Sequence, residues 1–151
     1  MGQGAREYLT SHKNCTKSKT IHIGRMDDFF YRKLKVYQQA LLQVKNIYAL
    51  TATFPSNEIY GLTNQIRRAA ISIPSNIAEG MGRFSIKERI HFLEIANGSI
   101  TETMCQLEIA NLLSYISDEE LKKNEETMAS ISRLLSGLRK SLEEKMNKTQ
   151  L

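Results

Sequence analysis

The chain has 151 residues, of which 41% are hydrophobic, and it contains two prolines, eight glycines and no tryptophan. This length suits one domain, and the scarcity of helix-breaking residues favours long helices over a turn-rich β fold. The longest apolar runs fall far short of the roughly 20 residues that a membrane-spanning helix needs. No apolar leader segment is visible near the N-terminus. We therefore expect a cytoplasmic, bacterial-type protein that makes no contact with a membrane.

The net charge of +5 is unevenly distributed along the chain. Residues 1–25 contain five basic residues and one acid, whereas residues 26–151 contain 16 basic and 15 acidic residues. Because residues 1–25 also lack a helical apolar period, we expect a basic, flexible N-terminal extension followed by one domain over residues 26–151. The extension either contacts phosphates or is an upstream segment without a role, and both interpretations stay open.

A first helix is predicted over residues 28–52. Its apolar residues recur at spacings of three and four, as on one face of an amphipathic helix. These residues are Phe30, Leu34, Tyr37, Leu41, Val44 and Tyr48. Pro55 ends the element, because the residue before a proline disfavours helical geometry.

A second helix is predicted over residues 62–83, LTNQIRRAAISIPSNIAEGMGR. Pro74 lies in its middle, where a proline removes the hydrogen bond to the carbonyl of Ala70. The apolar stripe nevertheless continues in phase past the proline, through Leu62, Ile66, Ala69, Ile73 and Ile77. We therefore expect one continuous helix that is kinked at Pro74, with Ser72 or Ser75 satisfying the freed carbonyl.

Two capping-box sequences, Ser85–Glu88 and Ser117–Glu120, predict the starts of a third and a fourth helix. Gly98 lies in the middle of the third helix and costs about 1 kcal/mol relative to alanine, a cost that is easier to explain if another backbone passes close by. Four long helices joined by short loops predict an all-α fold, an antiparallel up-down-up-down four-helix bundle.

Catalytic and metal-binding patterns are missing from the sequence. Glu88 and His91 have the spacing of half a di-metal bundle site, but His91 is the only histidine in residues 26–151 and a second pair is needed. The lack of a histidine with a patterned serine or cysteine also argues against a nucleophilic triad. We predict a protein that is not an enzyme and binds neither a metal nor a cofactor.

Polar residues on the second and third helices support two hypotheses. In the first, a partly buried polar network fixes the helix register or a subunit interface; its members are Gln65, Asn76, Glu79, Ser99 and Glu102. In the second, a basic strip contacts nucleic-acid phosphates; its members are Arg67, Arg68, Arg83, Lys87 and Arg89. The last three cluster at the second loop, where they concentrate positive potential at one end of the bundle.

Three segments carry a family resemblance: LTNQIRRAAISIPSNIAEGMGR, FLEIANGSITETMCQLEIA and LKVYQQAL. Together they resemble the bacterial four-helix-bundle family first noted in intervening sequences of large-subunit ribosomal RNA genes. The likeness covers about residues 28–145, and its most specific part is Gln65–Gly80. The sequence is similar, more distantly, to the accessory variability determinant proteins of diversity-generating retroelements.

The resemblance implies a four-helix bundle that assembles as a ring-like homopentamer. The more distant likeness implies a protein without enzymatic activity that binds a reverse transcriptase and RNA or DNA, with Arg67, Arg68 and Arg83 as candidates for nucleic-acid or partner contact. Our leading hypothesis is thus a non-catalytic homo-oligomer that binds nucleic acid or assists a reverse transcriptase. The alternative is a protein–protein scaffold whose arginines serve subunit packing. In either case we expect the kink at Pro74 to direct the outer face of its helix toward a neighbouring subunit.

Overall fold

The computed structural model describes residues 29–149 and shows four α-helices. They are α1 (Lys35–Thr51), α2 (Leu62–Gly82), α3 (Ile86–Leu112) and α4 (Asp118–Thr149). Two short 3-10 turns accompany them, η2 (Phe30–Lys33) before α1 and η3 (Ser56–Glu58) between α1 and α2. No strand occurs within residues 29–149, so the predicted all-α class is confirmed. The predicted extension, residues 1–25, lies outside the described range.

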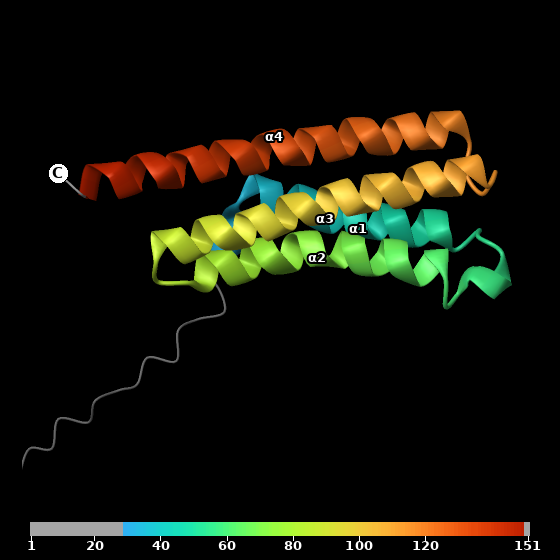
Figure 1. Cartoon of the computed structure of the whole chain (residues 1–151), viewed down its shortest axis with the longest axis horizontal. Helices are drawn as coiled ribbons and strands as arrows, with labels where there is room; N and C mark the ends of the chain where they lie inside the picture. Colours follow the sequence, from blue (N-terminus) through green and yellow to red (C-terminus); the bar gives the residue numbers. More distant parts are fainter. Residues whose placement is uncertain (1–28, 150–151) are drawn as a thin grey trace, which may run out of the picture.

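The helices lie alongside one another in an elongated bundle (Figure 1). The pairing of α2 with α3 is the most extensive, and α1 touches α4 much less. The α1–α2 and α3–α4 connections lie together at one end, which we call the two-loop end (Figure 1). The α2–α3 connection, η2 and the last turns of α4 lie toward the opposite end, which we call the α2–α3 end (Figure 1).

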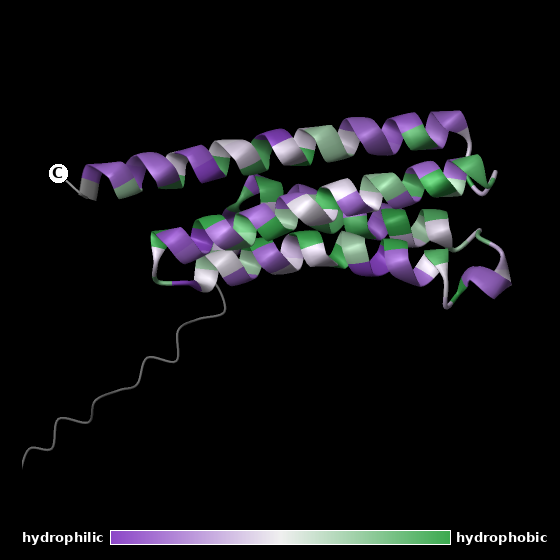
Figure 2. Cartoon of the chain, viewed as in Figure 1, coloured by the Kyte–Doolittle hydropathy of each residue, from purple (hydrophilic) through white to green (hydrophobic). Residues whose placement is uncertain are grey.

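Two hydrophobic clusters follow each other along the bundle. The cluster toward the α2–α3 end draws on all four helices and includes Val36, Ile77, Leu93 and Leu135. The cluster toward the two-loop end includes Ile47, Ile66, Leu107 and Ile116. The stripe predicted for α2 supplies Ile66, Ile73 and Ile77 to these clusters. The outer side of α4 carries many hydrophilic residues along its length (Figure 2).

The face that α1 buries differs from the predicted one. Its buried residues are Val36, Ala40, Gln43, Ile47 and Thr51, whereas Leu41 and Tyr48 of the predicted stripe are exposed. The buried polar groups have partners, because Gln43 Nε2 donates to Asn124 Oδ1 at 2.7 Å and Thr51 Oγ1 donates to the Ile47 carbonyl at 2.8 Å. Polar side chains with such partners can be buried, and the apolar residues beside them are left partly exposed.

The start of α1 is also later than predicted. The chain forms η2 first, and Leu34 then adopts an extended conformation with ψ 125° before α1 begins at Lys35. The ring of Tyr31 packs edge-on against Tyr37 with centroids 4.9 Å apart. This contact holds η2 against the first turn of α1.

Pro74 lies inside one uninterrupted helix, α2, as the continuous apolar stripe predicted. The serines act differently from the prediction, since Ser75 Oγ donates to the carbonyl of Ile71 at 2.8 Å and not to that of Ala70. Ser72 instead accepts hydrogen bonds from its neighbours, described below. The kink at Pro74 stays a prediction.

The helices α2 and α3 approach each other closely at Gly80. A Cβ atom on Gly80 would lie 2.9 Å from Cβ of Phe92 and 3.3 Å from the carbonyl oxygen of Arg89, so only glycine fits there without movement. No close backbone explains Gly98, because a Cβ atom there would meet nothing within 4 Å among the described residues. The residue of α3 that faces α2 at this level is the next one, Ser99.

Only one of the two predicted capping boxes forms. Ser117 and Glu120 exchange hydrogen bonds, Glu120 N–H to Ser117 Oγ at 3.2 Å and Ser117 N–H to Glu120 Oε2 at 2.8 Å. Ser85 precedes α3 but makes no side-chain capping bond. An unpredicted cap serves α2, whose Leu62 N–H donates to Glu58 Oε2 at 3.0 Å.

Candidate nucleic-acid interface

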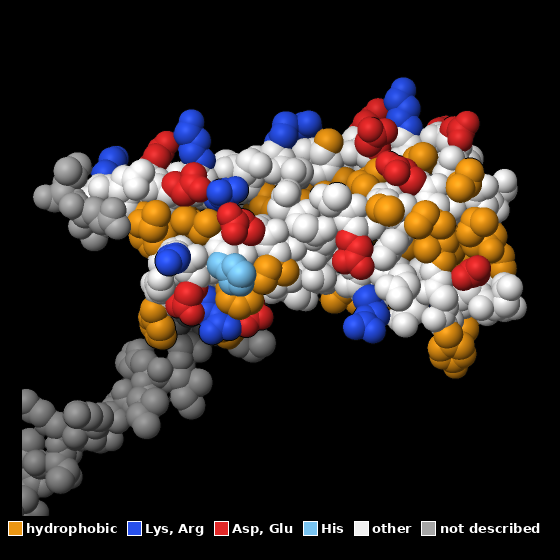
Figure 3. All heavy atoms as spheres, in the orientation of Figure 1, with side chains coloured by type: hydrophobic (Ala, Val, Ile, Leu, Met, Phe, Trp, Pro, Cys, Tyr) orange, Lys and Arg blue, Asp and Glu red, His pale blue; other side chains and the backbone are white. Residues whose placement is uncertain are grey.

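Charge is segregated along the bundle axis. The half toward the α2–α3 end, residues 29–43, 73–99 and 134–149, contains ten Lys and Arg residues and five Glu residues. The other half, residues 44–72 and 100–133, contains six Lys and Arg residues and eight Asp and Glu residues. Figure 3 shows basic side chains interspersed with acidic ones over the α2–α3 end, and mostly acidic side chains over the first turns of α4. The half toward the α2–α3 end therefore has the more positive electrostatic potential.

Arg83 and Arg89 stabilise the α2–α3 connection through their contacts and also give it positive charge. Arg83 forms an ion pair with Glu79, and its guanidinium lies 4.8 Å from the ring centroid of Phe92. Arg89 Nε donates to the carbonyl of Arg83 at 2.7 Å. The side chain of Lys87, by contrast, is exposed on the first turn of α3. The structure thus brings Arg83, Lys87 and Arg89 together at one end, as the sequence predicted.

Arg67 and Arg68 lie elsewhere, so the five predicted cations do not form one strip. Arg68 is separated from Arg83 by about 22 Å of α2, taking 1.5 Å per residue. The Arg67 guanidinium lies 4.6 Å from the ring centroid of Tyr48, and its Nε donates to Thr51 Oγ1 at 2.8 Å. Arg67 therefore packs α2 against α1. Arg68 is exposed on α2.

The predicted polar network exists only in part. Asn76 Nδ2 donates to Ser72 Oγ at 2.9 Å, and Ser99 Oγ donates to the same atom at 2.8 Å, so a short chain of hydrogen bonds links α2 to α3. The other three predicted members lie outside it: Glu79 pairs with Arg83, Glu102 accepts from Gln106 Nε2 at 3.2 Å, and Gln65 is exposed. The link is small and local to the middle of the α2–α3 pairing.

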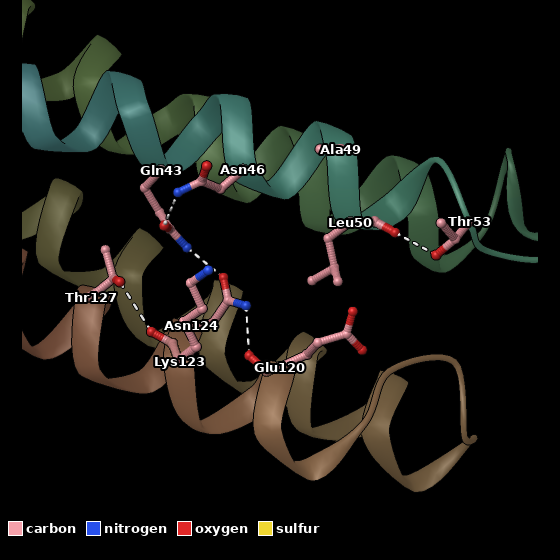
Figure 4. Close-up of a pocket in the computed structure, with 9 residues that line it drawn as sticks. All are labelled: Gln43, Asn46, Ala49, Leu50, Thr53, Glu120, Lys123, Asn124 and Thr127. Atoms are coloured by element: carbon pink, nitrogen blue, oxygen red, sulfur yellow. Dashed lines mark hydrogen bonds between the residues drawn. The ribbon is translucent and has the colours of Figure 1, made fainter.

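A second polar site between α1 and α4 was not predicted. A groove of about 340 Å³ is lined there by residues that include Gln43, Asn46, Lys123 and Asn124. Figure 4 shows the amides of Gln43 and Asn124 pointing toward each other from the two helices. Gln43 is 2% exposed and Asn124 is 9% exposed. No sequence signal connects them, since they are 81 residues apart.

Aromatic residues at the α2–α3 end were also missed as candidates. Phe84, between Arg83 and Ser85 in the connection, is 100% exposed. Phe29, which directly precedes η2, and Phe30, the first residue of η2, are exposed as well. The Arg32 guanidinium lies 5.0 Å from the Phe29 ring centroid. The remaining two phenylalanines, Phe54 and Phe92, are buried or partly buried. The sequence does hold a signal for Phe84, since an aromatic residue next to an arginine in a three-residue connection is a candidate for ligand contact.

Within residues 29–149, no group of three or more His, Cys, Asp or Glu side chains is arranged to hold a metal ion. His91 is exposed on α3. No helix in this part of the chain is long and apolar enough to cross a membrane.

These features define a four-helix-bundle protein whose cations gather at one end. The chain belongs to the 23S rRNA-intervening sequence protein family, which matches residues 32–137. It is similar to the crystal structure of a protein with unknown function from the S23 ribosomal protein family of Bacteroides thetaiotaomicron, with a TM-score of 0.61 and 26% sequence identity. That likeness covers 70% of this chain and 98% of the other chain. No curated protein matches the chain. The family expected from the sequence is thus confirmed, and the likeness to accessory variability determinant proteins stays a prediction.

Proposed function

We propose that this protein is a non-catalytic homo-oligomer, a pentamer, that binds RNA or DNA through the α2–α3 end of its bundle and can serve as an accessory to a reverse transcriptase. The observation that carries the proposal is the charge segregation, ten cations against five acids in that half. Phosphate binding depends mainly on such clustering of Lys and Arg and needs no recognition of base sequence.

The place where the described chain begins also supports binding at the α2–α3 end. The described chain begins at residue 29, beside η2, and η2 contacts α2. Residues 1–25, with five cations and one acid, are therefore connected to the bundle near its basic end. In this proposal the cations of residues 1–25 and those of the α2–α3 end both contact the phosphates.

The test is binding of a labelled structured RNA at low salt by the full-length protein, followed by fluorescence anisotropy. A triple variant, Lys33→Ala, Lys35→Ala and Lys87→Ala, removes three exposed cations from the basic half. Its matched control, Lys45→Ala, Lys122→Ala and Lys123→Ala, removes three exposed cations from the other half and changes the net charge equally. We expect the first variant to bind more weakly and to lower the salt slope by roughly 0.7–0.9 for each phosphate that is no longer neutralised, and the control to bind like the wild type. Absence of binding by the wild type, or equally weakened binding in both variants, contradicts the proposal.

A protein–protein scaffold without nucleic-acid contact is the second candidate. It is favoured by the exposed apolar residues of α1, Leu41, Leu42 and Tyr48, and by the use of Arg67 for packing on Tyr48. Light scattering separates the two: a stable oligomer that binds no RNA supports the scaffold, and a monomer removes the pentamer from both hypotheses. A reverse-transcriptase gene beside this one supports the accessory role, and direct pull-down of that enzyme tests it.

A further inference from the structure

We propose that the basic α2–α3 end binds single-stranded nucleic acid, with the Phe84 ring stacking on an unpaired base. This inference rests on the proposed function and adds the class of ligand. Its starting point is that all three exposed phenylalanines of the chain, Phe29, Phe30 and Phe84, lie in the basic half. Phe84 is 100% exposed, so no contact within the protomer accounts for an aromatic residue at that position.

The backbone that presents Phe84 is held on both sides. Arg83 N–H donates to the carbonyl of Gly80 at 3.1 Å, and Arg89 N–H donates to the carbonyl of Ser85 at 3.1 Å. Arg89 Nε also donates to the Arg83 carbonyl at 2.7 Å, across the connection. Because Gly80 lets α2 and α3 approach closely just before this connection, the turn is anchored to the bundle. The backbone of a turn held in this way loses little conformational entropy when a ligand binds.

The surrounding charges select an anionic ligand for this ring. Lys87 is exposed on the first turn of α3, Arg83 directly precedes Phe84, and Arg89 follows it five residues later. The nearby acids are Glu79, which pairs with Arg83, and Glu88. The bond from Arg89 to the Arg83 carbonyl uses Nε, so the terminal nitrogens of Arg89 can meet a phosphate. Aromatic rings set among cations are how proteins bind single strands, since the cations track the backbone and each base offers a face for stacking.

An unpaired base fits this arrangement better than a duplex does. In a duplex both faces of each base are covered by neighbouring pairs, and a ring can stack only by forcing them apart. In a single strand a base can turn out onto an exposed ring at little cost. The geometry therefore favours single strands, loops and overhangs.

The experiment compares the full-length protein with Phe84→Ala, Phe84→Tyr and Tyr60→Ala. The ligands are a short RNA without self-complementarity and the same RNA annealed to its complement, both measured by fluorescence anisotropy at fixed salt. We expect Phe84→Ala to weaken single-strand binding roughly 5- to 100-fold with an unchanged salt slope, because no charge is removed. Phe84→Tyr keeps the ring and should bind like the wild type. Tyr60 is 91% exposed at the two-loop end, so Tyr60→Ala controls for removal of an exposed ring.

The outcomes separate this inference from the proposed function. If the wild type binds neither RNA, both fail. If the triple lysine variant no longer binds while Phe84→Ala binds single strands like the wild type, the proposed function stands and the stacking role of Phe84 is overturned. Equally weakened single-strand and duplex binding in Phe84→Ala, or a smaller mass by light scattering, also overturns it, because the ring then serves general binding or subunit contact.

Discussion

The hydroxyl of Tyr115 donates a 3.1 Å hydrogen bond to Oε1 of Glu58, and this bond ties the α3–α4 connection to the α1–α2 connection. The other carboxylate oxygen of Glu58 accepts the N–H of Leu62 at 3.0 Å and so caps α2. The ring of Tyr115 also packs near that of Phe54, with centroids 5.4 Å apart. The Glu58 carboxylate thus links the two connections and caps the N-terminus of α2.

This bond predicts an alkaline loss of stability. The hydrogen bond to Glu58 raises the pKa of Tyr115 above its ordinary value of 10.0, followed by smaller effects of burial and of the Glu58 charge. The folded state therefore favours the neutral phenol, and this stabilisation is complete below pH 10 and is lost as the pH rises through the raised pKa. The urea concentration at which half of the wild-type protein is unfolded should decrease as the pH rises above 10. This decrease should be smaller in Tyr115→Phe. Parallel pH curves for the two proteins would contradict a role for this phenol.

Two glycines on facing helices predict opposite effects of the same substitution. Gly80→Ala places a Cβ atom 2.9 Å from Cβ of Phe92 and 3.3 Å from the Arg89 carbonyl oxygen, so α2 and α3 must move apart. We expect destabilisation by about 1–3 kcal/mol, the usual range for overpacking. Gly98→Ala meets nothing within 4 Å and should stabilise α3 by about 0.5–1 kcal/mol. Thermal and urea unfolding at one protein concentration measure the change in stability of both variants. A Gly80→Ala variant as stable as the wild type would show that α2 and α3 can move apart at this position without cost.

The buried amide pair between α1 and α4 predicts non-additive substitutions. Gln43→Ala removes the donor to Asn124 Oδ1 and leaves a buried acceptor without that partner, which costs about 1–3 kcal/mol. Asn124→Ala should cost a similar amount for the converse reason. The double variant should be destabilised by less than the sum of the single variants, since neither polar partner is then stranded. A double-mutant cycle in urea measures this coupling, and strict additivity would mean that the pair contributes no coupling.

The sequence predicted some of these features and could not have predicted others. The stripe Ile66, Ile73 and Ile77 on α2 is buried as expected, because these isoleucines share one face of the helix. On α1 two lines compete, and the buried one contains Gln43, whose partner Asn124 is distant in sequence. Local periodicity cannot contain that information.

The candidate site also has features that the sequence predicts and features that depend on the three-dimensional packing. The grouping of Arg83, Lys87 and Arg89 follows from a short connection, so the sequence predicted it. The separation of Arg67 from this group follows from its packing on Tyr48, which depends on how α2 lies against α1. The two capping-box sequences look alike, yet only Ser117 makes a capping bond with its own side chain. Side-chain geometry, and not residue spacing, decides which box forms.

Pro74 provides a test of the expected link between α2 and assembly. A proline inside a helix costs about 3 kcal/mol, yet Pro74 is buried within the uninterrupted α2. If the proline bends α2 to place its outer face against another subunit, Pro74→Ala restores the N–H that can bond to the Ala70 carbonyl and straightens the helix. We then expect unchanged or higher helix content by circular dichroism but a smaller mass by light scattering at low micromolar concentration. Ser75→Ala, on the exposed side of the same turn, keeps the proline and should assemble like the wild type. A Pro74→Ala variant with the wild-type mass would show that the proline is not needed for assembly. The free-energy cost of the proline would then be offset by packing within the protomer.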